Sequence, residues 1–536
     1  MVRLRGFVLA GIAFVACSEP DDGEIASALD PVAVLARASL DLRGVRPTAK
    51  ELAAIEADPT RLDSMIADFA DDPRFGDRIK EMFAGAWRTR VDDYPLPEGA
   101  YDEATAAQIM AAIGEEPLDL IAHIATEDLP YTHLVHSPDT FVDPVLLELW
   151  PLEAVTDDGT AVPPGTVRAR YLDGRPQAGV LTYNAVFWRH SSTVENANRG
   201  RTNAMSQALL CQSYLDRPID FPSNLDLTDS ESIRNAIATN PACQGCHSTM
   251  DPFASYFWGF MYGEPDAPQG TYAVELERSW QVYTGTAPAF FGVPGQRMAD
   301  LADHIAGDER FIGCAVRLVY EGMLGRDATI EDEGALAVHR EAFLDGELTL
   351  RSLVRSVLRD PSYRGVKATP RFGGSPEPVV RKVSPVDVMA RSIATLSGYA
   401  LATGGRPTTR LDAGLRTIAG GSDRGDATNV STGAILVQRR LAEAGAIHAV
   451  DAALAGTDGG GTLAPWLAEN DLQVAPEPDA LVELARIARS QILTPDDDEI
   501  LALATMWTEV ATISTTRDAW IAVVTTALAD PDHLIY

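Results

Sequence analysis

The residues best suited to chemistry lie at 240–252, in the stretch NPACQGCHSTMDP. Cys243, Cys246 and His247 form the pattern C-x-x-C-H, which is the attachment pattern of c-type haem. Thiols three residues apart lie on one helical turn, where both can reach the vinyl groups of one haem, and the histidine can ligate its iron. The sequence therefore predicts one covalent haem c, with His247 as the proximal iron ligand.

Two other sites could use the same residues. A zinc site would need a fourth ligand and usually a second cysteine pair, and the chain has no second C-x-x-C. A redox dithiol of the thioredoxin type would need a βαβ context, which the sequence does not show. We therefore prefer haem c to zinc and to a dithiol.

Haem c is attached outside the cytoplasm, and the N-terminus predicts export. Arg3 and Arg5 precede a short apolar run at 7–16, which is typical of a signal peptide. The run ends in FVAC, which resembles a bacterial lipobox, so Cys17 is expected to carry the lipid; the alternative is an ordinary signal peptide. Ser18 favours delivery to the outer membrane, and we expect a cell-surface or periplasmic lipoprotein of a Gram-negative bacterium. Lipid would be the only membrane anchor.

The remaining cysteines are Cys211 and Cys314. In an oxidising compartment two such cysteines are expected to form a disulfide. The alternative is two separate buried thiols.

The composition is that of a soluble globular protein, with 46% apolar residues and a net charge of −33. Such a surface repels phosphate backbones, so no nucleic-acid partner is expected. A chain of 536 residues is too long for one ordinary core, and we expect several domains.

Helical patterns dominate the elements that must position these residues, so the predicted fold class is mainly α. Thr48 and Glu51 form a capping box. Three segments, 62–75, 350–363 and 520–533, share one apolar helical face that stops at an Asp-Pro pair. Each is expected to close a helical module.

One stretch has a β pattern. Residues 166–184 alternate in polarity and contain a turn signal at Asp173-Gly174, which predicts a β-hairpin. The stretch 369–378 has the composition of a linker. Ser384 and Pro385 then predict a helix start, as N-cap and first helical residue.

Several segments resemble one family, the planctomycete-type cytochrome c-like proteins, which also occur in myxobacteria and are large, modular and exported. The resemblance rests on the following stretches: NPACQGCHSTMDPF, ASLDLRGVRPTAKEL, MIADFADDPRFGDR, YTHLVHSPDTFVDPVLLELW, AGVLTYNAVFWRHSSTVENANRGRTNAMSQALLCQ and FIGCAVRLVYEGMLGR. It implies helical modules of unknown function that flank a single haem segment.

These patterns divide the chain as follows: 1–16 lipoprotein signal peptide, 17–32 tether, 33–145 N-terminal helical module, 146–225 hairpin-containing segment, 226–368 cytochrome c-like haem domain, 369–383 linker and 384–536 C-terminal helical domain.

The ligand on the other side of the iron decides its reactivity. His190, Met261 and Met298 are the main candidates for this distal position, Met205 is a further one, and an open position is the alternative. Met250 is too close to His247 to reach the far face. Four side chains could contact the haem edge or its propionates: Trp188, Arg189, Arg201 and Trp258.

His133 and His136 have the i, i+3 spacing of a helical metal pair. The prolines at 130 and 138 favour a loop there instead, so we do not expect a metal at this pair.

The best-supported function is one-electron transfer to or from a redox partner protein that docks at an exposed haem edge. One rival is a haem enzyme with an open sixth iron position, of peroxidase or small-molecule oxidation type. The other is a surface binding or scaffold protein in which the haem is structural.

Overall fold

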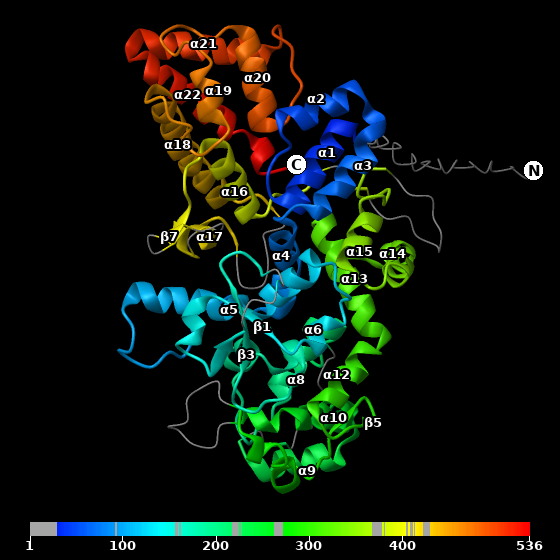
Figure 1. Cartoon of the computed structure of the whole chain (residues 1–536). Helices are drawn as coiled ribbons and strands as arrows, with labels where there is room; N and C mark the ends of the chain where they lie inside the picture. Colours follow the sequence, from blue (N-terminus) through cyan, green and yellow to red (C-terminus); the bar gives the residue numbers. More distant parts are fainter. Residues whose placement is uncertain are drawn as a thin grey trace, which may run out of the picture.

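A computed structural model describes residues 29–91, 94–155, 159, 162–216, 225–226, 228–261, 272–366, 378–379, 381–403, 406–407, 411, 413–421 and 429–536. The predicted mainly helical fold is confirmed, since helices dominate and the strands are short (Figure 1). Among the described residues, none of the helices combines the length and apolar character that a membrane span requires. The signal peptide, Cys17 and most of the tether lie outside the described residues.

Five helices begin the described part of the chain. Their bounds are α1 Pro31–Arg43, α2 Ala49–Ala57, α3 Leu62–Asp68, α4 Phe75–Trp87 and α5 Glu103–Thr126, with 3-10 turns η1 Pro59–Arg61 and η2 Phe69–Asp71. The predicted capping box of α2 is confirmed, because the Thr48 side chain accepts from the Glu51 N–H and Glu51 accepts from the Thr48 N–H.

A small sheet follows these helices. The elements are α6 His133–His136, β1 Thr140–Val142, η3 Pro144–Leu147, β2 Leu152–Ala154, β3 Val167–Tyr171, η4 Gly179–Thr182, α7 Asn184–Arg189 and α8 Arg199–Leu210. The sheet is antiparallel in the order β1-β3-β2, with Phe141 opposite Arg168 and Glu153 opposite Arg170.

The predicted hairpin across 166–184 is wrong in its second half, because β3 pairs with two earlier strands. After the turn at Gly174 the chain forms η4 rather than a strand. Pro176 has no N–H to give to a strand ladder. Arg175 is buried and its Nη1 donates to the carbonyl of Thr182 at 2.6 Å, which folds this segment back on itself.

The next group of elements contains the C-x-x-C-H segment, and the helices around that segment lie at the end of the molecule opposite to the C-terminal helices (Figure 1). The bounds are α9 Ser230–Thr239, α10 Pro241–Ala254, η5 Ser255–Phe260, η6 Val274–Leu276, α11 Trp280–Tyr283, β4 Ala289–Phe290, β5 Val293–Pro294, α12 Met298–Ala306, α13 Glu309–Leu324, η7 Ile330–Asp332, α14 Glu333–Asp345 and α15 Leu350–Val357.

The C-terminal elements form a separate helical unit. They are α16 Val386–Ser397, β6 Ala402–Thr403, β7 Arg406–Pro407, α17 Ala413–Ile418, α18 Thr432–Leu454, α19 Leu463–Ala468, α20 Pro478–Arg489, α21 Asp498–Ile513, α22 Thr516–Leu528 and η8 Pro531–His533. The predicted helix start is wrong by one residue. Pro385 occupies the N-cap position of α16, and the Ser384 N–H instead donates to the carbonyl of Leu534 at 2.8 Å.

The described residues form two large apolar cores, one from the elements before α16 and one from the C-terminal elements. The first draws buried residues from positions 34 to 379, and the second from positions 386 to 534. The first core includes side chains from each of the three units predicted between 33 and 368, so their boundaries stay a prediction. The three Asp-Pro segments each bury their predicted apolar face, for example through Ile66, Leu353 and Val524.

A buried polar cluster joins the two cores. Asp41 on α1 is fully buried, and its Oδ1 accepts from Lys382 Nζ at 2.6 Å and from Tyr536 Oη at 2.7 Å. The backbones of Lys382 and Tyr536 pair as well, with N···O distances of 2.7 and 2.8 Å. These contacts place the C-terminus beside α1 (Figure 1).

Candidate functional site

The C-x-x-C-H pattern lies in the first half of α10. This helix starts sharply because the Asn240 side chain accepts from the Ala242 N–H at 2.8 Å and Pro241 fills the first helical position. Cys243 and Cys246 are free thiols, both partly exposed and one turn apart. The sequence spacing thus places two accessible sulfur atoms on one side of a helix.

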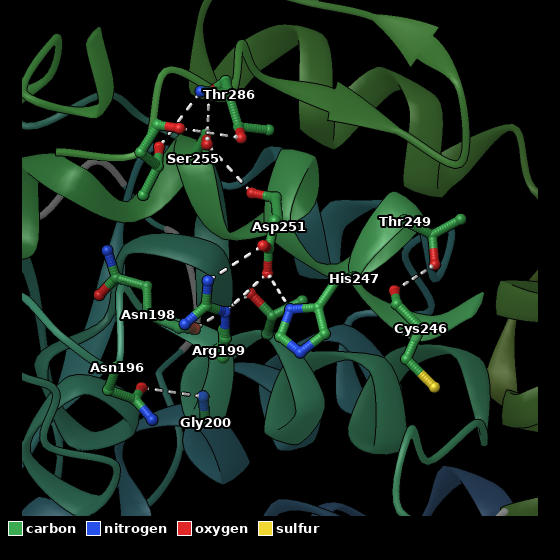
Figure 2. Close-up of polar contacts among 12 residues, drawn as sticks. Asn196, Asn198, Arg199, Gly200, Cys246, His247, Thr249, Asp251, Ser255 and Thr286 are labelled. Carbon is green, nitrogen blue, oxygen red and sulfur yellow. Dashed lines mark hydrogen bonds and ion pairs between the residues drawn. The ribbon is translucent and has the colours of Figure 1, made fainter. Parts of the chain in front are cut away.

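The imidazole of His247 contacts a carboxylate on its own helix. Its Nδ1 lies 2.9 Å from Asp251 Oδ1, one turn further along α10 (Figure 2). Arg199, at the start of α8, donates from Nε to Oδ1 at 2.7 Å and from Nη2 to Oδ2 at 3.0 Å. We call these three residues the Asp251 triad.

Burial of Asp251 opposes its ionisation, but the hydrogen bonds from His247 and Arg199 outweigh burial and hold the pKa of this carboxyl below its usual value. An ionised carboxylate only accepts hydrogen bonds. An ionised Asp251 therefore requires a proton on Nδ1 of His247, and in the neutral ring with that proton Nε2 carries the lone pair. A histidine in this tautomer can ligate a metal through Nε2.

The expected pair Cys211 and Cys314 is joined by a disulfide in the structure. Cys211 caps the C-terminal end of α8, and Cys314 lies in the middle of α13. The bond therefore fastens the helix that carries Arg199 to a long helix of the first core.

Arg201 ties two of the distal candidates together. Its side chain is almost fully buried, donating from Nε to the carbonyl of His190 at 2.8 Å, and its Nη1 lies 3.9 Å from Met261 Sδ. It also donates to the carbonyl of Phe260 at 3.0 Å. The guanidinium of Arg201 is thus committed to the protein, which does not fit the predicted contact with a haem propionate.

Three more of the residues predicted to lie near the haem are also packed within the protein. Trp258 is buried and stacks on Tyr283 with ring centroids 5.2 Å apart. Met205 and Met298 lie in the first apolar core. The structure does not select a distal ligand, so His190, Met261 and Met298 stay predictions.

His190 is held neutral by its surroundings. Burial, followed by the positive charges of Arg189, Arg201 and Arg88, lowers the pKa of His190 to about 4. A neutral imidazole is the form that binds metals.

His133 and His136 form a single helical turn, so the loop expected there is wrong. Both ring nitrogens of His136 are engaged: Nδ1 lies 3.0 Å from the Thr132 carbonyl, and Nε2 lies 3.0 Å from Asp303 Oδ1. His133 Nδ1 lies 3.2 Å from the carbonyl of Pro130. Hydrogen bonds within the protein therefore engage a ring nitrogen of each histidine.

Sequence reasoning missed Asp251 and Arg199. Asp251 could have been found, because a residue four positions after His247 shares its helical face. Arg199 lies 52 residues from Asp251, and no local pattern connects the two.

Comparison with known families gives one match. The model of the family described as PSCyt3, Protein of unknown function (DUF1588), matches residues 177–262. This segment includes α8 and all of α10, and hence the whole Asp251 triad. The match agrees, for this one domain, with the resemblance to planctomycete cytochrome-like proteins. Searches among curated proteins and among solved structures return no match.

Proposed function

We propose that this chain is an exported c-type haem lipoprotein that transfers single electrons. One observation carries the proposal: two partly exposed thiols lie together on α10 with an imidazole whose Nδ1 contacts Asp251. This donor set suits haem c, which needs two thioether bonds and one proximal nitrogen. The PSCyt3 match over this segment supports the same conclusion.

In this proposal Cys243 and Cys246 hold the haem, and His247 ligates its iron through Nε2. Bound haem would supply an iron that cycles between Fe(III) and Fe(II). The chain would fix the orientation of His247 through Asp251 and leave one edge of the site accessible, since both cysteines are partly exposed. A redox partner protein would dock at that edge.

The proposed location is the outer membrane or periplasm, with the lipid on Cys17. The sequence pattern at 1–17 supports this location, and the C-x-x-C-H pattern agrees with it, because haem c is attached outside the cytoplasm.

The experiment that tests attachment is co-expression of the chain with haem c maturation proteins, followed by a pyridine spectrum under denaturing conditions. We expect one haem per chain that stays bound on denaturation, and a Cys246→Ala variant that shifts to the spectrum of a single thioether. Gln244→Ala, at an exposed position between the two cysteines, is the matched control and should match the wild type. Haem that dissociates on denaturation would refute the proposal.

The same preparation separates a carrier from an enzyme. A carrier should keep its reduced spectrum under CO and should not turn over peroxide. Rapid CO uptake together with peroxide turnover would replace electron transfer by the enzyme hypothesis.

A further inference from the structure

The Asp251 triad goes beyond what haem attachment requires. Attachment uses the two thiols and one imidazole nitrogen, whereas the triad adds a carboxylate and a guanidinium on the opposite side of the imidazole (Figure 2). The relative exposures of the side chains are 21% for His247, 13% for Asp251 and 21% for Arg199. The three groups are therefore mostly shielded from water, which strengthens their electrostatic interaction.

A carboxylate partner changes a metal-bound imidazole in two ways. It fixes the tautomer and ring orientation, and it raises the basicity of the ligating nitrogen. A more basic ligand stabilises Fe(III) relative to Fe(II) and so lowers the reduction potential.

Arg199 acts on the same carboxylate from the other side. It contacts both oxygens of Asp251, in the two-pronged geometry that suits a guanidinium and a carboxylate. A cation so placed withdraws negative charge from the hydrogen bond to His247 and limits the effect of Asp251.

We infer that Asp251 is a positioning residue that fixes the Nε2-ligating tautomer of His247 and lowers the reduction potential, and that Arg199 moderates it through Asp251. The effects of Asp251 and Arg199 on the reduction potential rest on the proposed function, whereas the effect of Asp251 on the tautomer of His247 does not. The competing explanation is an i, i+4 pair that only stabilises α10.

The first test uses the full chain produced without haem maturation, so it does not depend on haem. Long-range ¹H–¹⁵N spectra at pH 8 should show His247 protonated on Nδ1. Asp251→Ala should move the proton to Nε2, the tautomer that imidazole prefers in water, while Glu231→Gln on α9 should leave it on Nδ1. A wild-type His247 protonated on Nε2 would overturn the inference.

The second test is the midpoint potential of the haem-loaded chain. Asp251→Asn keeps an acceptor but removes the charge, and it should raise the potential by about 59 mV, equivalent to about a tenfold change in the one-electron equilibrium constant. Arg199→Gln should lower the potential. In the double variant the effect of Arg199→Gln should vanish, because its route through Asp251 is gone.

Glu231→Gln is again the control, because it removes one negative charge of an exposed side chain on α9 and none of the triad's hydrogen bonds. Equal shifts in Asp251→Asn and Glu231→Gln would reduce Asp251 to a structural role and overturn the inference. Absence of covalent haem would refute the proposed function alone, and the tautomer measurement would still decide the role of Asp251.

Discussion

Glu116 is a buried carboxyl group whose ionisation is coupled to the packing of three elements. It lies on α5, is fully buried and accepts hydrogen bonds from Tyr171 Oη at 2.5 Å, from the Ala185 N–H at 2.9 Å and from Thr140 Oγ1 at 3.2 Å. It thereby joins α5 to the sheet and to α7, the helix that leads to His190. Burial outweighs these hydrogen bonds and raises the pKa of Glu116 to about 7.

The raised pKa predicts a specific pH dependence. Between the unfolded value of 4.5 and the folded value of about 7, the folded chain keeps a proton that the unfolded chain has lost, so stability falls as pH rises through this window. The difference corresponds to about 3 kcal/mol. Glu116→Gln should lose this slope in urea unfolding at pH 4.5 and 7.5, whereas Glu98→Gln at an exposed turn should retain it. An unchanged slope in Glu116→Gln would show that Glu116 is not its source.

Some residues of the candidate site could be predicted from the sequence, and others could not. The thiols and His247 belong to one contiguous pattern, so their types and order were readable. Arg199 was not, because it meets Asp251 only after α8 and α10 pack together. The distal side depends on tertiary placement too, which is why four candidate residues could be named from the sequence but none could be selected.

Helix α8, which carries Arg199, is joined to α13 by a disulfide. The disulfide joins residues 103 positions apart, at the end of α8 and within α13. A cross-link that closes so long a loop restricts the unfolded chain and stabilises the fold typically by about 2–4 kcal/mol.

The double variant Cys211→Ala/Cys314→Ala should therefore unfold at a lower urea concentration, and its free energy of unfolding should fall by about 2–4 kcal/mol. The wild type should drop to the same midpoint after reduction with dithiothreitol, while the double variant should not respond to it. Equal midpoints for oxidised wild type and double variant would mean that the bond contributes nothing to stability.

Element prediction succeeded where local physics decides the structure. The capping box of α2 and the helices that stop before Asp-Pro depend on neighbouring residues, and both are present. The failed hairpin and the displaced start of α16 have the opposite cause. β3 finds its partners in β1 and β2, and Ser384 pairs with Leu534, so distant segments overrode the local signals.

For the whole molecule, the cluster around Asp41 is a buried polar contact between the two cores. Lys382 Nζ is buried and also donates to the carbonyls of Gly322 and Met323 at 2.9 Å each, so one side chain connects α1, α13 and the segment before α16. Removing one partner of a buried ion pair is costly because it leaves a charge without compensation.

Lys382→Met should lower the free energy of unfolding by about 3–5 kcal/mol. It should also separate the thermal unfolding of the two cores into two calorimetric transitions. Lys50→Met, at an exposed position on α2, is the control and should change stability by less than about 0.5 kcal/mol. A single transition at the wild-type temperature in Lys382→Met would contradict this role.

The same cluster delays the final packing of α1 while the chain is being synthesised. Asp41 leaves the ribosome early, but Lys382 follows 341 residues later and Tyr536 495 residues later. At a synthesis rate of about 5–20 residues per second, α1 waits roughly 25 to 100 s for the last of these partners. Helix α1 is therefore among the last elements to reach its final surroundings. During that interval the carboxylate of Asp41 must stay in water or be covered by a bound chaperone.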